Sequence, residues 1–199
     1  MMLSIITPTL DASATLAACL NASMSQPGDF EHLFVDGGSQ DGTREMVLST
    51  RNSRVRLIDA PGSSIYGAQN VGIQAARGDW IYVIGADDVL AINSVDRLMA
   101  ALAPAADDLA YARVPISISG RKPHFASRQQ SWVYRRALLL ERGGFPGNNL
   151  PELDFNQSIS GLPHIVLEIA MCQIALGGAS SKPGGLLTPR SKSTTTKGP

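Results

Sequence analysis

The run of five apolar residues at positions 80–84, Trp-Ile-Tyr-Val-Ile, constrains the fold more than any other feature of this sequence. An unbroken run of this kind is typical of a strand buried on both faces of a parallel sheet. It leads into Gly85, Ala86, Asp87 and Asp88, so two adjacent carboxylates stand where the strand leaves the sheet. Because open α/β sheets bind ligands beyond the carboxyl ends of their strands, the run predicts a buried strand that opens onto a site.

The pair of carboxylates at Asp87 and Asp88 has two interpretations. Adjacent carboxylates on a loop repel each other unless a cation or a ligand hydroxyl satisfies them, and oxygen ligands suit Mg²⁺ or Mn²⁺. The pair is therefore a candidate site for a divalent cation. The alternative is an Asp-rich turn that caps the next helix. The residues in the other loops at the same edge are needed to distinguish the two interpretations.

Strand and helix signals alternate through the first hundred residues. This alternation indicates right-handed crossovers and a mostly parallel sheet, and hence an α/β fold. No apolar run approaches the roughly 20 residues of a membrane-spanning helix. We expect strands at residues 3–7, 30–35, 55–58 and 81–84, and helices at 14–24, 44–49, 66–76 and 94–102.

Composition limits the partners of the chain. Its 199 residues are 44% hydrophobic, which is enough to bury the core of one domain. Basic and acidic residues number 17 each, so no overall positive field argues for nucleic acid. Cys19 and Cys172 lack metal-ligand spacing, which favours a reducing, cytoplasmic location.

The last residues differ from the rest in charge. We expect one domain over residues 1–181 and a flexible basic tail over residues 182–199. A basic tail would also suit peripheral contact with an anionic membrane surface. From residue 182 onward there is no acid, and the basic residues are Lys182, Arg190, Lys192 and Lys197.

Three predicted strands end in polar loops at one edge of the sheet, which suits a nucleotide site. A dinucleotide-binding Rossmann domain would use Asp36 for the ribose, but its phosphate loop needs glycines after the first strand. Residues 8–14 contain no glycine, and no Gly-Lys-Ser/Thr phosphate loop occurs elsewhere. The phosphates of a nucleotide would therefore have to be neutralised by a bound cation.

An ordered set of motifs carries a resemblance to a known family. The set consists of Ser-Ile-Ile-Thr-Pro-Thr at 4–9, Val-Asp-Gly-Gly-Ser-Gln-Asp-Gly-Thr at 35–43, Ile-Tyr-Gly-Ala-Gln-Asn-Val-Gly-Ile at 65–73, Ala-Arg-Gly-Asp-Trp at 76–80 and Gly-Ala-Asp-Asp at 85–88. Together they resemble family 2 glycosyltransferases of the GT-A fold, in particular bacterial members that build lipopolysaccharide, capsule or exopolysaccharide. The resemblance implies a Rossmann-like, mixed, mostly parallel sheet flanked by helices. It also implies a nucleotide-sugar-binding half over residues 1–104 and an acceptor half over 105–181.

The resemblance assigns the base end of the donor site. Thr7, Pro8 and Thr9 would line the base and ribose pocket. Asp36 would accept a hydrogen bond from the imide N–H of uracil or thymine, a donor that cytosine lacks. The implied donor is therefore a UDP-sugar or a dTDP-sugar.

The resemblance also assigns the phosphate end. Asp87 would bind the ribose, and Asp88 would hold the Mn²⁺ or Mg²⁺ ion that bridges the diphosphate and stabilises the leaving group. Asn70 would contact the phosphates, with a plain amide on the helix surface as the alternative. Asp41 is expected to brace its own loop.

Signals in the second half are weaker. We expect strands at 109–114 and 116–119, then a strand and a short helix over 129–142. A Gly-Gly-Phe turn follows, which resembles the family. Many relatives have His-Gln where this chain has Gln129 and Gln130. Residues 163–174 fit two short strands or one helix, and the resemblance favours the strands.

A general base is the remaining requirement of an inverting transferase, because the acceptor hydroxyl must lose its proton. In the family an acidic residue after the Gly-Gly-Phe turn has this role, which implies Asp154, with Glu152 in reserve. Asn156 stands where a second acid is usual and cannot take up a proton. The alternative for Asp154 is a charge favoured by the dipole at a helix N-terminus.

Two functions remain open. The first is metal-dependent transfer of a sugar from a UDP- or dTDP-sugar to a glycan or lipid-linked acceptor at the inner face of the cytoplasmic membrane. The second is a nucleotide-sugar-binding module whose acceptor half is incomplete and inactive. We favour the enzyme. A short acceptor half would also leave apolar surface for a homodimer to cover.

Overall fold

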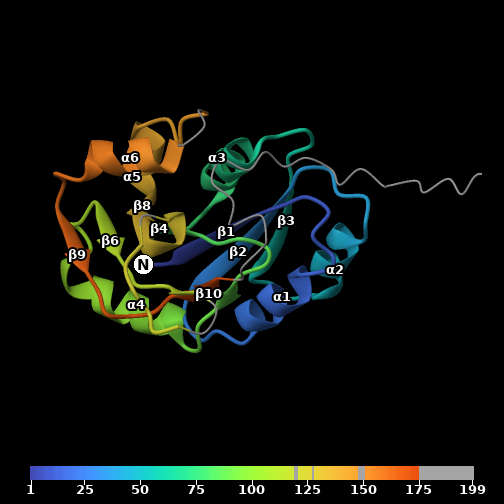
Figure 1. Ribbon diagram of the computed structural model, residues 1–199, viewed down its shortest axis with the longest axis horizontal. Helices are drawn as coiled ribbons and strands as arrows, with labels where there is room; N and C mark the ends of the chain where they lie inside the picture. The colour runs from blue at the N-terminus through green and yellow to red at the C-terminus, as the bar shows by residue number, and fades with distance from the viewer. Residues whose placement is uncertain (119–120, 127, 148–150, 175–199) are drawn as a thin grey trace, which may run out of the picture.

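The computed structural model describes residues 1–118, 121–126, 128–147 and 151–174. Strands and helices alternate in its first half as the sequence predicts, and Figure 1 shows a central sheet between two layers of helices. The elements of this half are β1 (Leu3–Thr9), α1 (Leu16–Met24), β2 (Phe30–Asp36), α2 (Thr43–Ser49), β3 (Val55–Asp59), α3 (Ile65–Ala75), β4 (Trp80–Val83), β5 (Val89–Leu90) and α4 (Ser94–Leu102).

The second half is built from shorter elements. Two short 3₁₀ turns, η1 (Ala103–Ala105) and η2 (Gln129–Ser131), precede strands β6 and β8. The prediction of two strands within residues 163–174 is confirmed. The other elements are β6 (Tyr111–Arg113), β7 (Ser117–Ile118), β8 (Trp132–Arg135), α5 (Arg136–Glu141), α6 (Pro151–Ile159), β9 (His164–Val166) and β10 (Cys172–Ile174).

The large sheet has the strand order β3-β2-β1-β4-β8-β6-β9. Strands β1 to β4 are parallel to one another, β8 is antiparallel to both β4 and β6, and β9 is parallel to β6. Strands β4, β6 and β9 therefore point the same way, and their carboxyl ends lie on the same edge as those of β1 and β2. The sheet is mixed and mostly parallel, as predicted.

Strand β1 continues two residues beyond its predicted end and includes Pro8. The Ile6 carbonyl accepts from Ile84 on the β4 side, whereas the Thr9 carbonyl accepts from Gly37 on the β2 side. Since the backbone groups of successive residues alternate between the two sides, the Pro8 nitrogen faces the β4 side, beyond the end of that strand. The donor that proline lacks is therefore not needed there.

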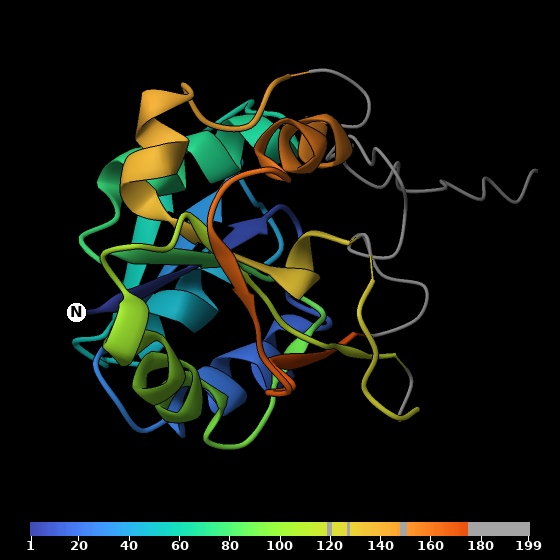
Figure 2. The same cartoon turned by 90° about the vertical axis from the view of Figure 1, so that its left-hand side faces the viewer.

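Helices cover both faces of the large sheet (Figure 1 and Figure 2). Helices α3, α5 and α6 pack on one face, where Ile73, Leu139 and Phe155 share a buried cluster with inward-facing sheet residues. Helices α1 and α4 pack on the other face through Leu20 and Leu98. Both faces of β4 are thus buried against apolar side chains, which explains its unbroken hydrophobic run.

A second, three-stranded sheet with the order β5-β10-β7 was not predicted. Strand β5 follows Asp88 directly, in a segment expected to be a loop, and it pairs antiparallel with β10 through Leu90 and Cys172. Strand β10 pairs parallel with β7. A two-residue strand shows no periodicity in sequence, and its partner is distant in the chain. The small sheet fastens the segment after Asp88 to the end of the described chain.

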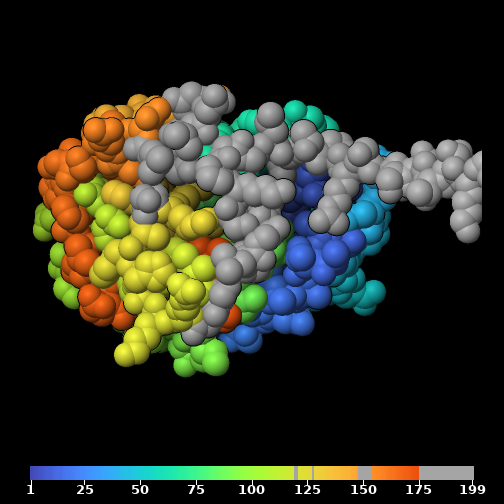
Figure 3. All heavy atoms as spheres, viewed as in Figure 1, coloured from blue at the N-terminus to red at the C-terminus, as the bar shows by residue number. Residues whose placement is uncertain are grey.

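The two halves of the chain share the large sheet. Residue Ile81 of β4 is paired with Tyr134 of β8, which joins the N-terminal strands to those of the second half. In the space-filling view the blue N-terminal residues lie on one side and the orange residues of α6 and β9 on the other (Figure 3). The predicted donor and acceptor halves are therefore connected through one continuous sheet.

None of the helices within the described ranges is long and apolar enough to cross a membrane. The predicted tail at 182–199, together with the predicted domain end at 181, lies outside the described residues.

Candidate active site

The ends of β1, β2 and β4 meet at one edge of the large sheet. Thr9, the last residue of β1, is paired with Asp36, the last residue of β2. The Gly37 N–H donates to the Thr9 carbonyl at 2.8 Å, and this bond holds the carboxyl ends of β1 and β2 together. Strand β4 pairs with β1 on its other side, and Asp87 and Asp88 follow it. The fold thus brings together three of the predicted site segments.

The hydroxyls of Thr7 and Thr9 bind the neighbouring strand β2. Thr7 Oγ1 lies 2.8 Å from His32 Nε2, and Thr9 Oγ1 donates to Asp36 Oδ2 at 3.0 Å. Both threonines are fully buried. Their side chains hold β1 against β2 in this structure, and a pocket lined by Thr7, Pro8 and Thr9 stays a prediction.

The Asp36 carboxylate is saturated by donors from the protein. Oδ1 accepts from the N–H groups of Gly38 and Ser39, at 3.0 and 2.9 Å, and from Arg44 Nη1 at 3.2 Å. Oδ2 accepts from the hydroxyls of Thr9 and Ser39. These donors fill the roughly four acceptor positions of a carboxylate. A base imide can reach Asp36 only by displacing one of them, and the two hydroxyls are the donors that can rotate away.

The same contacts keep Asp36 charged. Burial alone would raise the pKa of its carboxyl, but the hydrogen bonds from Ser39, Gly38 and Arg44 outweigh burial and hold the pKa below its usual value. Arg44 also forms an ion pair with Asp59 at the end of β3. Sequence reasoning missed Arg44, because an arginine in the first turn of a helix gives no sign that it reaches the ends of the strands before and after that helix.

Asp41 braces its own loop, as expected. Its Oδ1 accepts from the N–H and the hydroxyl of Thr43 at the start of α2, and its Oδ2 accepts from the Ser13 N–H at 2.9 Å. Burial raises the pKa of Asp41 less than these hydrogen bonds lower it, and the pKa falls to about 2. The carboxylate therefore fixes the loop between β2 and α2 against the loop after β1.

Asp88 is buried beneath the sheet edge. Its side chain has no exposed area, and its Oδ2 accepts from the Gly85 N–H at 3.0 Å and from Gln130 Nε2 at 3.1 Å. The first bond closes the turn after β4, and the second comes from η2, at the start of β8. The carboxylate is therefore held from both halves of the chain.

Asp87 supplies an unfilled acceptor. Its Oδ2 is buried and has no hydrogen-bond partner, which is unfavourable unless a cation or a ligand donor completes it. Within the described ranges no group of three or more His, Cys, Asp and Glu side chains converges on one point. One or two carboxylates completed by substrate phosphates are the usual ligand set of Mg²⁺. Asp87 and Asp88 therefore fit the ion that the sequence implies.

Gln130 contacts Asp88, and the sequence did not predict this contact. Its side chain donates to Asp88, and its backbone carbonyl accepts from the Tyr82 hydroxyl at 2.9 Å. Its neighbour Gln129 exchanges two amide hydrogen bonds with Gln69 on α3, each 2.9 Å long. A pair of hydrogen-bonded amides, Gln129 and Gln69, therefore occupies the place where many relatives have a histidine. The sequence gives no signal for it, because the partners lie in different halves of the chain.

Asn70 fastens the Gly-Gly-Phe turn to α3. Its Oδ1 accepts from the Phe145 N–H at 2.8 Å, and its Nδ2 donates to the Phe145 carbonyl at 2.9 Å. Gly144 has a φ of +85°, and a Cβ there would lie 2.3 Å from Asn70 Oδ1, so the approach requires glycine. The amide is thus engaged within the protein, and its contact with phosphates stays a prediction.

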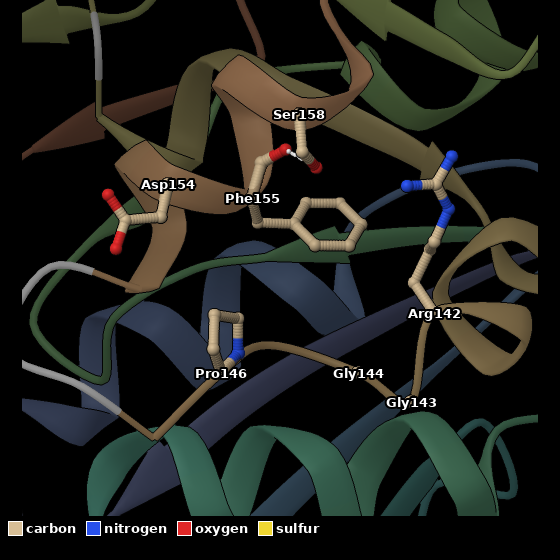
Figure 4. Close-up of a pocket in the computed structure, with 7 residues that line it drawn as sticks. All are labelled: Arg142, Gly143, Gly144, Pro146, Asp154, Phe155 and Ser158. Carbon is tan, nitrogen blue, oxygen red and sulfur yellow. Dashed lines mark hydrogen bonds between the residues drawn. The ribbon is translucent and has the colours of Figure 1, made fainter.

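Helix α6 carries Asp154 in its first turn. The helix leads into β9, which begins at the amino edge of the sheet, so α6 itself begins near the carboxyl edge. Asp154 is exposed, and its carboxylate points away from the Phe155 ring (Figure 4). The side chain of Glu152 is outside the described part of the chain. A hollow of 310 Å³ beside α6 is lined by Arg142, Gly143, Gly144, Pro146, Asp154, Phe155 and Ser158.

Solved structures share the fold of this chain. S. aureus TarS 1-349 has a TM-score of 0.77 at 18% identity, over 88% of this chain and 60% of that chain, and it has also been solved in complex with UDP. The mannosyltransferase PcManGT from Pyrobaculum calidifontis, in complex with GDP-Man and Mn²⁺, has a TM-score of 0.69 at 16% identity, over 86% of this chain and 56% of that chain. This likeness shows the GT-A fold predicted from the sequence.

Curated relatives match a little under half of the chain. A PGL/p-HBAD biosynthesis glycosyltransferase of Mycobacterium bovis is 43% identical over 93 residues, which are 45% of this chain and 36% of the relative. The UDP-Glc:alpha-D-GlcNAc-diphosphoundecaprenol beta-1,3-glucosyltransferase WfgD of Escherichia coli is 31% identical over 99 residues, which are 48% of this chain and 38% of the relative. The matches thus span well under two thirds of either relative.

The family model described as Glycosyl transferase family 2 matches residues 4–152. The match includes the strand ends that carry Asp36, Asp87 and Asp88, together with the Gly-Gly-Phe turn of the second half. It covers most of the chain, and the chain therefore belongs to glycosyl transferase family 2.

Proposed function

We propose that this chain is an inverting glycosyltransferase that moves a sugar from a UDP- or dTDP-sugar to a glycan or lipid-linked acceptor in the synthesis of a bacterial surface polysaccharide. One observation carries the proposal. Asp36, Asp87 and Asp88 meet at the carboxyl edge of the sheet, and Asp87 Oδ2 is buried there without a partner. The similarity to TarS, which has been solved with UDP, and to WfgD, whose name specifies a UDP-glucose donor, supports the choice of nucleotide.

The donor would lie across the ends of β1, β2 and β4. Asp36 would accept the imide N–H of uracil or thymine once the Thr9 or Ser39 hydroxyl rotates away, since both now donate to its Oδ2. Asp87 would bind the ribose or complete the ion site, and Asp88 would hold the ion in the orientation that Gln130 gives it. A bound Mn²⁺ or Mg²⁺ supplies positive charge that stabilises the leaving diphosphate.

The acceptor would approach from the side of α6. Asp154 stands exposed in the first turn of that helix, where its carboxylate can accept the proton of the attacking hydroxyl. An accessible carboxylate on the acceptor side is what inversion with a single displacement requires. The alternative, a donor-binding module without activity, predicts the same nucleotide binding but no transfer.

The proposed location is the inner face of the cytoplasmic membrane, with peripheral contact through the basic tail. The proposal includes a homodimer that covers the outer edge of the sheet. Strand β9 lies at that edge and exposes 55% of Val166. Analytical ultracentrifugation of the wild type and of Val166→Lys tests this part, because a charge at that edge would oppose pairing.

The experiment that tests the function is calorimetric titration of UDP, TDP, GDP and CDP into the purified protein, first with Mn²⁺ and then with EDTA. Binding of UDP or TDP that requires Mn²⁺ supports the donor site. Hydrolysis and transfer assays with candidate sugar nucleotides then separate the enzyme from the inactive module. Absence of binding by all four nucleotides would overturn the proposal.

A further inference from the structure

Arg113 is a cation at the active edge of the sheet that the proposed chemistry does not use. It is the last residue of β6, and its pairing partner is Trp132, the first residue of β8. Strand β8 separates β6 from β4, so the two carboxyl ends lie about 10 Å apart, or two strand spacings. Trp132 belongs to the cluster that α6 covers, and Arg113 therefore lies on the face of the sheet that carries Asp154.

The guanidinium of Arg113 is held in a fixed position. Its Cζ stacks 4.1 Å from the centroid of the Trp132 ring and lies 5.9 Å from that of Phe125. One of its Nη atoms donates to the Ala126 carbonyl at 3.0 Å. Burial lowers the pKa of Arg113, but a guanidinium stays charged in proteins. The side chain is thus a pre-organised cation.

Donors around this cation lack acceptors. Arg113 Nε is buried without a hydrogen-bond partner, and no carboxylate in the described ranges forms an ion pair with it. Trp132 Nε1 and Asn156 Nδ2 are also buried and unpartnered, in side chains that are only 7% and 5% exposed. Asn156 lies close to Trp132, since its Oδ1 accepts from Tyr134, whose ring stacks on Trp132. All three unpartnered atoms are N–H donors.

We propose that Arg113 and Trp132 form a subsite for a phosphate group of the acceptor, so that the substrate is a phosphorylated or diphosphate-linked glycan. The inference rests on the proposed function. An anion with several acceptor oxygens satisfies an unpaired guanidinium and a neighbouring indole N–H, and arginine matches the geometry of phosphate. A neutral sugar hydroxyl would leave the positive charge uncompensated. The position beside the helix of Asp154 places this phosphate on the acceptor side of the donor.

The test uses the full chain saturated with UDP and Mg²⁺, so that the donor site is already filled. Glucose 1-phosphate is then titrated by calorimetry, with glucose as the neutral probe. We expect the wild type to bind glucose 1-phosphate but not glucose. The affinity for glucose 1-phosphate should fall roughly tenfold to a hundredfold in Arg113→Gln. Arg97→Gln is the matched control, because Arg97 is exposed on α4, on the opposite face of the sheet, and should bind as the wild type does.

A second variant keeps the inference testable if Arg113→Gln fails to fold. Trp132→Phe retains the ring beneath the guanidinium and removes only the indole N–H, and it should weaken binding of glucose 1-phosphate severalfold. UDP binding should be unchanged in both variants. If UDP fails to bind the wild type, the proposed function is wrong. If UDP binds and Arg113→Gln binds glucose 1-phosphate as tightly as the wild type, only the subsite is wrong.

A phosphate can also come from a membrane headgroup. Sedimentation with phosphatidylglycerol vesicles separates this source from the acceptor. Vesicle binding that depends on Arg113, without binding of glucose 1-phosphate, would overturn the acceptor assignment. Equal vesicle binding by the wild type and Arg113→Gln, together with loss of glucose 1-phosphate binding in the variant, supports it.

Discussion

Substitution of Asn70 by alanine separates its two interpretations, a phosphate contact and a brace for the Gly-Gly-Phe turn. The structure predicts a loss of stability, because both hydrogen bonds to Phe145 would disappear. Two bonds contribute roughly 1–3 kcal/mol together. Alanine regains about 0.5 kcal/mol of helix propensity over asparagine. The expected net destabilisation is therefore about 1.5 kcal/mol.

The assay is urea unfolding of the wild type and Asn70→Ala, followed by circular dichroism, with a thermal scan alongside. For a chain of this size, 1.5 kcal/mol lowers Tm by about 3–6 °C. Asn21→Ala is the matched control, because Asn21 is exposed on α1 and its side chain forms no hydrogen bond with the residues that the structure describes. That control should gain stability by about 0.5 kcal/mol from propensity alone.

The opposite result would refute the reasoning. If Asn70→Ala gained as much stability as Asn21→Ala, the two bonds to Phe145 would contribute nothing. A tenfold loss of UDP affinity with no change in Tm would support the interpretation that Asn70 contacts the phosphates. A loss of stability with unchanged UDP affinity assigns it to the turn.

The remaining predictions address the site and the core. Asp88→Asn should abolish Mn²⁺-dependent UDP binding in calorimetry, whereas Asp154→Asn should keep that binding and lose transfer; full turnover by Asp154→Asn would exclude it as the base. Burial lowers the pKa of His32 to about 3, so between pH 6.5 and pH 3 only the unfolded state takes up the proton. The free energy of unfolding therefore decreases as the pH is lowered through this range. Urea unfolding should show about 2 kcal/mol less stability at pH 5.0 than at pH 7.5 from this group, and a flat profile would mean that the folded ring takes up its proton as readily as the unfolded one. Gly78→Ala should lower stability by at least about 2 kcal/mol in the same assay, because a Cβ would lie 2.6 Å from the Ser4 backbone nitrogen; wild-type stability would show that the strand can shift.

The donor half could be predicted because its signals are local. An unbroken apolar run marks β4, and short, mostly apolar segments mark β1 and β2, since each of these strands is buried on both faces. Their order along the chain then places Asp36 and Asp87 at one edge, because parallel strands end on the same side. The signal that Asp41 braces its own loop was equally local, since its hydrogen bonds to Thr43 depend on a two-residue spacing.

What could not be predicted depends on pairing between distant segments. Strand β5 exists because β10 lies beside it, and neither strand has a length that shows periodicity. The saturation of Asp36 was also hidden. Arg44 and Thr9 come from different elements, and sequence alone does not reveal how many donors converge on one carboxylate.

The contacts between the two halves bear on whether this chain can bind a donor without a working acceptor half. Asp88 receives one of its hydrogen bonds from Gln130, and Gln129 is fixed to α3 by Gln69. The start of β8 therefore positions the carboxylate proposed to hold the ion. If the second half had lost its structure, Asp88 would lose that donor and the orientation that it gives the carboxylate. The proposed ion site and the acceptor half are thus connected by hydrogen bonds in this fold, which favours the proposed enzyme over a donor-binding remnant.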